Sequence, residues 1–268
     1  MIRIYLFFIY LFLLSSGCKR IAAHKEKGIV SFSPSLTQMV YALGKGKQIN
    51  CVTKYDEWPP EVRKLPKVGG FLDISMENIL RCNPSVVLLT EMHGELAEKL
   101  KSMSIPHLEL RTRNISEVLS SIRKLSVHLG AEVRGRELVA DLEKQLKPKK
   151  CKSKKRFLIT LGRSAPSLKN LVGAGAGTYL DELGKLAGGE NVLESRMFAY
   201  PSIGMESLVQ LNPDVIIDIV VSDGSSKDWD MVPFRKKPQI EIVVENHVYT
   251  PGIRMGKTLE TFHKILCP

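Results

Sequence analysis

Two glutamates, Glu77 and Glu206, stand at the same position in two copies of one sequence pattern. The first copy runs from Ile74 to Leu89 and the second from Ile203 to Asp218, a constant offset of 129 residues (74 to 203, 89 to 218). Each copy predicts a short amphipathic helix that opens at Met-Glu, ends at Asn-Pro and leads into an apolar strand. A carboxylate in a first helical turn interacts favourably with the helix dipole, and an exposed one can also pair with an arginine of a partner.

The length of the repeat indicates how the chain is organised. A period of 129 residues is too long for a solenoid, so the repeat predicts two similar α/β halves. Two matched lobes leave a cleft between them, and clefts are where proteins bind small ligands. We therefore expect an α/β fold of two Rossmann-like lobes with the ligand cleft between the lobes.

A long helical pattern separates the two halves. Between residues 116 and 146, apolar residues recur mostly at steps of three or four. This predicts one backbone helix of roughly 46 Å at 1.5 Å per residue, with Gly130 and Gly135 inside it. The predicted domains are an N-terminal lobe (28–115), the backbone helix (116–148) and a C-terminal lobe (149–268). A rigid helix between the lobes would limit their motion when a ligand binds.

No combination of residues in this sequence indicates catalysis. The motifs Gly-x-Ser-x-Gly, His-Glu-x-x-His and the P-loop are absent. Gly173-Ala-Gly-Ala-Gly-Thr178 resembles a dinucleotide-binding turn, but Thr178 replaces the third glycine and the turn lies deep in the chain. The histidines are scattered without the paired spacing of metal ligands; they are His24, His93, His107, His128, His247 and His263. We expect ligand binding without turnover, and no cofactor or resident metal.

The N-terminus carries an export signal. After Arg3, residues 4–14 are uninterruptedly apolar but too few to span a bilayer, and Ser-Ser-Gly-Cys18 follows. Small residues before a cysteine are typical of a bacterial lipoprotein cleavage site. We expect a signal peptide over 1–17, lipidation of Cys18 and a linker over 18–27, which would give an exported, membrane-anchored protein in the periplasm or at the cell surface. A plain secretory signal with an incidental cysteine is the alternative.

Cysteine content and charge limit the possible partners. An exported chain can pair Cys51, Cys82, Cys151 and Cys267, although Cys51 and Cys82 lie in apolar patterns that suit buried free thiols equally well. The net charge of +11 is concentrated in residues 147–156, where no aromatic residues are interleaved. We interpret this stretch as a solvated linker, with attraction to an anionic membrane as a lesser alternative, and expect no nucleic-acid partner.

Several motifs together resemble a known family. They are Ser33-Pro-Ser35, Asp56-Glu-Trp-Pro-Pro60, the Met-Glu repeat, the long helix and Gly188-Gly-Glu-Asn191. This combination resembles the helical-backbone class of periplasmic substrate-binding proteins, which serve ABC importers of cobalamin, iron–siderophores and haem. The similarity extends from Ile29 to the C-terminus and is greatest to the cobalamin-binding members. It implies a monomer that captures a macrocycle or iron chelate and delivers it to a permease and its ATPase.

The resemblance also implies roles for individual residues. In that family one exposed glutamate per lobe docks onto permease arginines, and these positions correspond to Glu77 and Glu206. The ligand would lie between aromatic walls that suit a corrin or porphyrin, with Arg254 facing a propionate, amide or phosphate. The predicted wall residues are Tyr55, Trp58, Phe71, Met92 and His93 on one side, and Tyr179, Tyr200 and Arg254 on the other.

The sequence departs from the cobalamin-binding members at two places. They pair a cysteine just before Gly-Gly-Glu-Asn with one near the C-terminus, but Ala187 stands at the first position here, so that disulfide is not expected. Their tryptophan-bearing segments are replaced by Gly70-Phe-Leu-Asp73 and Glu91-Met-His-Gly94. Haem, with Tyr179, Tyr200 or His93 as axial ligand, and a ferric siderophore are therefore alternative ligands. An exported enzyme and a structural surface lipoprotein are weaker alternatives.

Overall fold

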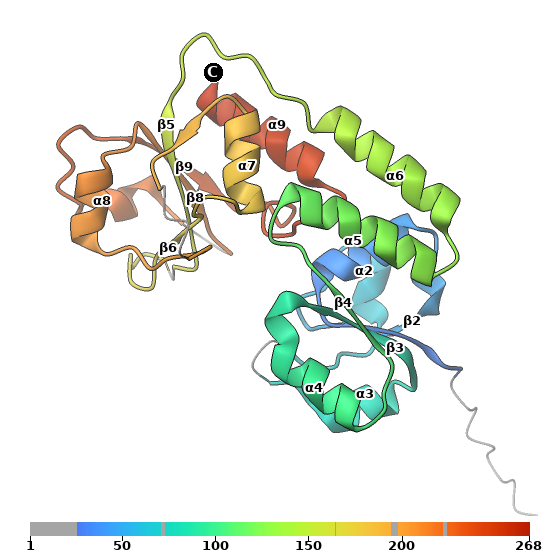
Figure 1. The fold of residues 1–268 in the computed structure, drawn as a ribbon. Coiled ribbons are helices and arrows are strands. Elements are labelled where there is room, and N and C mark those ends of the chain that lie inside the picture. The colour runs from blue at the N-terminus through green and yellow to red at the C-terminus, as the bar shows by residue number, and fades with distance from the viewer. Residues whose placement is uncertain (1–25, 71–72, 164, 194–197, 222–223) are drawn as a thin grey trace, which may run out of the picture.

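The computed structural model describes residues 26–70, 73–163, 165–193, 198–221 and 224–268. It has two α/β lobes, and helices α5 and α6 lie beside their junction (Figure 1). Cys18 and Phe71, predicted as the lipidation site and a ligand contact, lie outside the described residues. Within the described part of the chain, no helix is both long enough and apolar enough to cross a bilayer.

The N-terminal lobe is built on a parallel sheet with strand order β2-β1-β3-β4. Its strands are β1 (Gly28–Ser31), β2 (Ile49–Cys51), β3 (Pro84–Thr90) and β4 (His107–Leu110). Its helices are α2 (Pro34–Ala42), α3 (Met76–Arg81) and α4 (Gly94–Ser102), with short 3₁₀ turns η1 (Gly46–Gln48), η2 (Pro60–Lys64) and η3 (Glu91–His93). Helix α2 begins at Pro34, because proline suits the first helical position.

The C-terminal lobe has a sheet of order β6-β5-β8-β9, with β7 also pairing with β5. Its strands are β5 (Arg156–Leu161), β6 (Val172–Gly173), β7 (Glu190–Asn191), β8 (Val215–Ile219) and β9 (Gln239–Val243). Its helices are α7 (Tyr179–Leu186), α8 (Met205–Leu211), the 3₁₀ turn η4 (Ser226–Trp229) and α9 (Met255–Leu266). Only β6 runs antiparallel among the strand pairs described here.

The repeat is confirmed as two equivalent helix–strand units. Helices α3 and α8 begin at equivalent methionines, and each leads into a buried parallel strand. The asparagines of the two Asn-Pro pairs, Asn83 and Asn212, both take the left-handed conformation, with φ of 48° and 40°. Asparagine tolerates this conformation better than most residues, and the proline that follows cannot continue the helix.

The prediction of one continuous backbone helix is wrong. The segment forms two helices, α5 (Ile115–His128) and α6 (Glu132–Gln145), which fold back on each other as a hairpin (Figure 1). Gly130, at φ 58°, ends α5 in the left-handed conformation that glycine adopts at low cost. Gly135 then packs so closely that a Cβ there would lie 2.4 Å from Ser126 Cβ. The periodicity continues across the turn because both helices face the same core.

This core extends through both lobes. One apolar cluster joins residues of the first lobe, of α5 and α6, and of the second lobe, including Leu36, Ile122, Leu142, Phe157 and Leu180. The helical hairpin therefore contributes apolar residues to a core that both lobes share, and it is not a single rigid connector. Limited lobe motion on ligand binding stays a prediction, and it now depends on this shared core instead of on one rigid helix.

All four cysteines in the described residues form disulfides. Cys51 on β2 pairs with Cys82 at the end of α3, and Cys151 pairs with Cys267 after α9. Ala187 rules out the family's usual pair, but the sulfur atoms of Cys151 and Cys267 lie 3.6 and 3.3 Å from the Ala187 carbonyl oxygen. A cysteine from the basic linker thus supplies the partner that position 187 lacks.

Candidate functional site: the cleft between the lobes

A cavity of about 330 Å³ lies between the two lobes. Loops that follow β1 and β2 form one wall, and loops that follow β8 and β9 form the other. The carboxyl ends of parallel strands are where open α/β sheets bind ligands. The lining residues include Ser33, Ser35, Gln38, Lys54, Tyr55, Glu57 and Trp58 from the first lobe, and Val221, Val244, Asn246, Tyr249, Thr250 and Arg254 from the second.

Three of the predicted wall residues meet in this cavity. The guanidinium carbon of Arg254 lies 4.9 Å from the centre of the Trp58 ring, a cation–π contact across the cleft. Arg254 Nε also donates a hydrogen bond of 3.2 Å to Gln38 Oε1. Burial lowers the pKa of Arg254, although guanidinium stays charged at any physiological pH. Tyr55 lies beside them, 56% exposed, with the Lys54 ammonium 5.4 Å from its ring centre.

Further contacts hold the lobes together at this end of the cleft. Asn246 Nδ2 donates to Glu57 Oε2 at 2.7 Å, and Ser35 Oγ donates to the carbonyl of Pro251. Together with the contacts of Arg254, these bonds join loops that are about 190 to 216 residues apart in sequence. Polar groups that line the cleft therefore also join the two lobes at one end of it.

Tyr249 is a cleft residue that the sequence analysis missed. Its hydroxyl is buried and has no hydrogen-bond partner among the described residues. Burial, together with the negative charge of Asp218, raises the pKa of Tyr249 to about 12, so the phenol stays protonated and can donate. Like Trp58 and Tyr200, it is an aromatic residue close to a proline in a loop, and that criterion could have found it.

Met92 and His93 do not line this cavity. They border a separate hollow of about 610 Å³ on the first lobe, together with Ile74, Met76 and Lys99. His93 is buried and its Nδ1 lies 2.9 Å from Thr90 Oγ1, within the capping box that begins η3. Burial lowers the pKa of His93, which therefore favours the neutral ring. The structure therefore does not place these two residues beside Trp58, and a contact of either one with the ligand stays a prediction.

The two predicted tyrosines of the second lobe have different environments. Tyr179 is buried in the shared core and its hydroxyl donates to the Val248 carbonyl at 2.8 Å, so its placement on the cleft wall was wrong. The apolar face of α7 carries it inward. Tyr200 is 39% exposed, and desolvation together with the carboxylate of Glu91 in the first lobe raises its pKa to about 12. Tyr200 thus faces the first lobe outside the cavity of Trp58.

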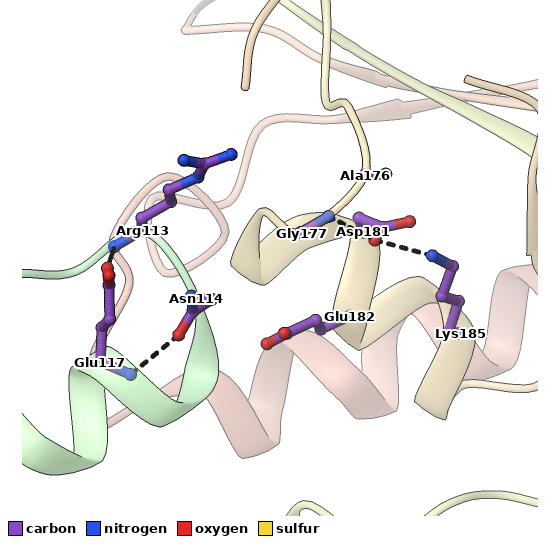
Figure 2. Close-up of a pocket in the computed structure, with 8 residues that line it drawn as sticks. All are labelled: Arg113, Asn114, Glu117, Ala176, Gly177, Asp181, Glu182 and Lys185. Atoms are coloured by element: carbon purple, nitrogen blue, oxygen red, sulfur yellow. Dashed lines mark hydrogen bonds and ion pairs between the residues drawn. The ribbon is translucent and has the colours of Figure 1, made fainter. Parts of the chain in front are cut away.

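A third pocket, a hollow of about 460 Å³, lies where α5 and α7 begin (Figure 2). The carboxylates that line it already accept hydrogen bonds or form an ion pair within the protein. Glu117 accepts from the Arg113 backbone, Glu182 accepts from the Ile115 backbone, and Asp181 pairs with Lys185. Glu182 of α7 thereby satisfies the first N–H group of α5, one of the unpaired donors of a helix start. Polar groups that line this hollow thus join α5 to α7.

The glycine-rich turn before α7 borders the same hollow. Thr178, which replaces the third glycine of a dinucleotide fingerprint, caps α7 by accepting a hydrogen bond of 3.2 Å from the Asp181 backbone. Gly177 N–H donates to the Asp181 carboxylate at 2.9 Å. A carboxylate therefore already occupies the position where a phosphate would bind.

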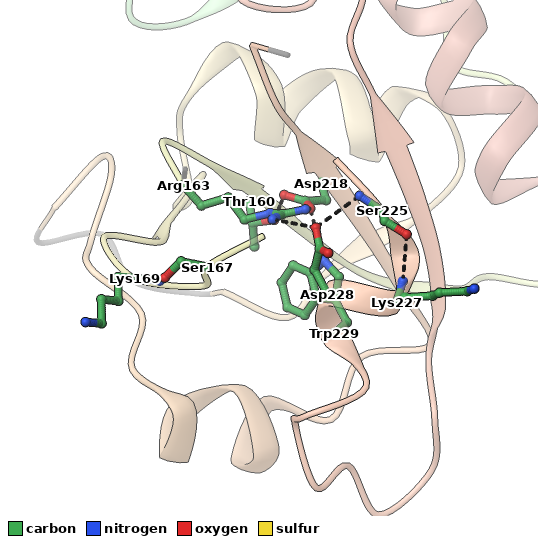
Figure 3. Close-up of polar contacts among 9 residues, drawn as sticks. All are labelled: Thr160, Arg163, Ser167, Lys169, Asp218, Ser225, Lys227, Asp228 and Trp229. Atoms are coloured by element: carbon green, nitrogen blue, oxygen red, sulfur yellow. Dashed lines mark hydrogen bonds and ion pairs between the residues drawn. The ribbon is translucent and has the colours of Figure 1, made fainter. Parts of the chain in front are cut away.

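A buried ionic network lies behind the wall of the second lobe (Figure 3). Asp218, the last residue of the second repeat copy, is fully buried at 0% exposure. It accepts from Arg163 Nε at 2.7 Å, from Trp229 Nε1 at 3.0 Å and from Thr160 Oγ1 at 3.1 Å. Arg163 also pairs with Asp228 at 3.0 Å, which joins η4 to the strand ends. The network thus joins η4 to β5 and β8, and β8 leads to cavity residue Val221.

Glu77 and Glu206 lie away from the cavity. They occupy the first turns of α3 and α8, one in each lobe, and both are exposed (Figure 1). Glu77 pairs with Arg81 at 2.7 Å, and Glu206 accepts a hydrogen bond of 3.5 Å from Gln210. These contacts are weak and replaceable, so both carboxylates are available to a partner protein.

Comparison of the sequence with known proteins identifies a family. Residues 29–228 match the family described as periplasmic binding protein. A vitamin B12-binding protein of Vibrio parahaemolyticus is 24% identical over 231 residues, which cover 83% of this chain and 80% of that protein. An uncharacterised ABC transporter substrate-binding lipoprotein of Bacillus subtilis is 29% identical over 265 residues, 91% of this chain and 81% of that protein.

Solved structures share the fold. A periplasmic haem-binding protein from Pseudomonas aeruginosa superposes with a TM-score of 0.77 at 20% identity, covering 90% of this chain and 93% of that one. The periplasmic vitamin B12-binding protein of Vibrio cholerae gives 0.70 at 21% identity, with coverages of 90% and 97%. These structures confirm the fold of two α/β lobes. The match over residues 29–228 shows that the chain belongs to the periplasmic binding protein family.

Proposed function

We propose that this chain captures a corrinoid of the cobalamin type between its lobes and delivers it to an ABC permease. The observation that carries the proposal is the aromatic and cationic wall formed by Tyr55, Trp58 and Arg254 in one inter-lobe cavity. The names of several sequence relatives, which are vitamin B12-binding proteins, favour this ligand over others.

The chemistry of the wall suits a flat ligand with polar edges. Trp58 and Tyr55 offer ring faces to a macrocycle. Arg254 supplies fixed donors for an amide, carboxylate or phosphate, and the unpaired Tyr249 hydroxyl supplies another donor. A corrinoid is larger than the 330 Å³ cavity. We expect its edge to enter the cavity, and Arg254 to exchange its contact with Gln38 for one with the ligand.

Replacing Trp58 with alanine should weaken cyanocobalamin binding by roughly thirtyfold, about 2 kcal/mol, as is typical of a central aromatic contact. Isothermal titration calorimetry of the purified chain measures this directly. The matched control is Arg136→Ala on α6, an exposed residue outside the cavity, which should bind like the wild type. Equal affinity of Trp58→Ala and wild type would remove the cavity from the proposal.

Haem is the second candidate ligand, and Tyr200 is the observation that favours it. Of the three proposed axial ligands, Tyr179 and His93 are buried and only Tyr200 is substantially exposed. If haemin binds and cobalamin does not, with a shift of the Soret band that Tyr200→Phe abolishes, haem replaces the corrinoid in this proposal. A ferric siderophore stays the third possibility.

Anchoring at the membrane is part of the same proposal. We expect a monomer, tethered in the periplasm or at the cell surface through lipidated Cys18, which keeps it close to its permease and ATPase. Two or three acyl chains anchor firmly, because each buried methylene contributes about 0.8 kcal/mol. A metabolic palmitate analogue should label the wild type and leave Cys18→Ser unlabelled; equal labelling of both would disprove the anchor.

A further inference from the structure

Three side chains converge on one backbone carbonyl at the end of the second lobe. Cys151 comes from the basic linker, and His263 and Cys267 come from the last turn and end of α9. The Ala187 carbonyl oxygen lies 3.0 Å from His263 Nδ1, 3.3 Å from Cys267 Sγ and 3.6 Å from Cys151 Sγ. One donor atom from each of the three side chains lies within 4.8 Å of the others, and all three residues are half-buried. No other group of three possible metal ligands is found among the described residues.

The backbone at this place is shaped to admit the sulfur of Cys151. Gly188 has φ of 100°, which only glycine adopts readily. A Cβ on Gly188 would lie 2.5 Å from Cys151 Sγ and 3.2 Å from Cys267 Sγ. A side chain at position 188 would therefore displace the Cys151 sulfur, crowd the Cys267 sulfur and strain the backbone.

Two sulfurs and one imidazole are a donor set that zinc prefers. Zinc sites with two cysteines and one histidine are known, and metal–ligand bonds of about 2.0–2.3 Å place donor atoms of a tetrahedron roughly 3.3–3.8 Å apart. The present spacing needs only small side-chain movements to reach this geometry. Water or the Ala187 carbonyl can complete the coordination shell, and half-burial leaves a path for the ion to enter.

We propose that Cys151, His263 and Cys267 form a binding site for a thiophilic cation such as Zn²⁺ when the Cys151–Cys267 disulfide is reduced. A dithiol supplies two electrons and two protons, which convert the disulfide to two thiols while the dithiol becomes a cyclic disulfide. Zinc then displaces the two thiol protons and takes a lone pair from His263. The disulfide and the metal use the same sulfur atoms, so the two states exclude each other. Either state ties α9 to the linker before β5.

The test uses the purified mature chain in which Cys18 is replaced by serine and Cys51 and Cys82 by alanine, so that any thiols come from the proposed site. The protein is reduced with dithiothreitol, freed of reductant without oxygen, and titrated with Zn²⁺ against a chromophoric chelator. We expect one zinc per chain in the reduced protein and none in the oxidised protein. His263→Asn, which leaves the disulfide intact, should weaken zinc binding by more than about tenfold, and Cys267→Ser should abolish it.

Two results would overturn the proposal: no zinc uptake by the reduced protein, or unchanged affinity in His263→Asn. If the Cys51→Ala, Cys82→Ala protein does not fold, the wild type and its His263→Asn variant are compared after reduction with Co²⁺ as the probe. The visible absorption of tetrahedral Co²⁺ should appear in the wild type and be lost or altered in His263→Asn. Identical spectra would then disprove a role for the imidazole.

Discussion

Replacing Asp218 with alanine is expected to lower the free energy of unfolding by about 3–5 kcal/mol, the usual cost of removing one partner of a buried ion pair. The change leaves the Arg163 guanidinium, whose side chain is 0% exposed, with Asp228 as its remaining carboxylate. It also removes the acceptor of the Trp229 indole N–H and of the Thr160 hydroxyl. Urea unfolding, followed by circular dichroism, measures the loss.

The same lobe provides a matched control. Asp230 pairs with Lys237 at 2.6 Å, but both side chains are more than half exposed. Solvent screens such a pair, so Asp230→Ala should cost no more than about 1 kcal/mol. If both variants unfold at the same urea concentration, the buried network contributes nothing beyond an ordinary surface pair and the prediction fails.

A comparison of the two repeat copies shows that the strand itself does not need this network. At the position equivalent to Asp218, the first lobe has Leu89, which is buried in an apolar cluster. A parallel strand at this place is therefore stable without any charge. The charge in the second lobe instead joins η4 to the strand ends, and burial together with the charge of Asp218 raises the pKa of Tyr249 in the cavity. We infer that the network holds η4 against the strands that lead to one wall of the cleft.

The features that were predictable from sequence are those that neighbouring residues determine. The two helix–strand units followed from a local pattern of apolar residues, and the Asn-Pro pair marked both helix ends because asparagine accepts the left-handed conformation. Trp58 and Arg254 lie on loops next to a strand or helix end and meet in one cavity, while their contact with a ligand stays a prediction.

The features that sequence could not give depend on distant parts of the chain. A three-residue turn at Gly130 leaves the helical periodicity intact when both helices pack on one core, so the periodicity does not reveal the hairpin. Tyr179 was assigned to the cleft from its position in the chain, but the rotation of α7 directs its ring into the core. The pairing of Cys151 with Cys267 spans 116 residues and depends on the fold itself.

Reversing the charge of both repeated glutamates, Glu77→Lys with Glu206→Lys, should leave ligand affinity within about 0.5 kcal/mol of the wild type. Neither carboxylate lines the cavity, and the Glu77–Arg81 pair is an exposed i,i+4 contact that contributes no more than about 0.5 kcal/mol to stability. Association with the permease should weaken by about 2–5 kcal/mol, because arginines of the partner would be left unpaired or facing a like charge.

The measurement is stimulation of the reconstituted transporter's ATPase by the purified, ligand-loaded chain. The control variant reverses two carboxylates on α6, Glu132→Lys with Glu137→Lys, which changes the net charge equally and also breaks one exposed pair, that of Glu137 with Arg134. A loss of stimulation confined to the first variant would establish Glu77 and Glu206 as docking residues. Equal loss in both would indicate a general charge effect. Normal stimulation by the Glu77→Lys, Glu206→Lys protein would mean that the two glutamates only stabilise the first turns of their helices. Such a helix-dipole role predicts a small loss of stability with transport intact.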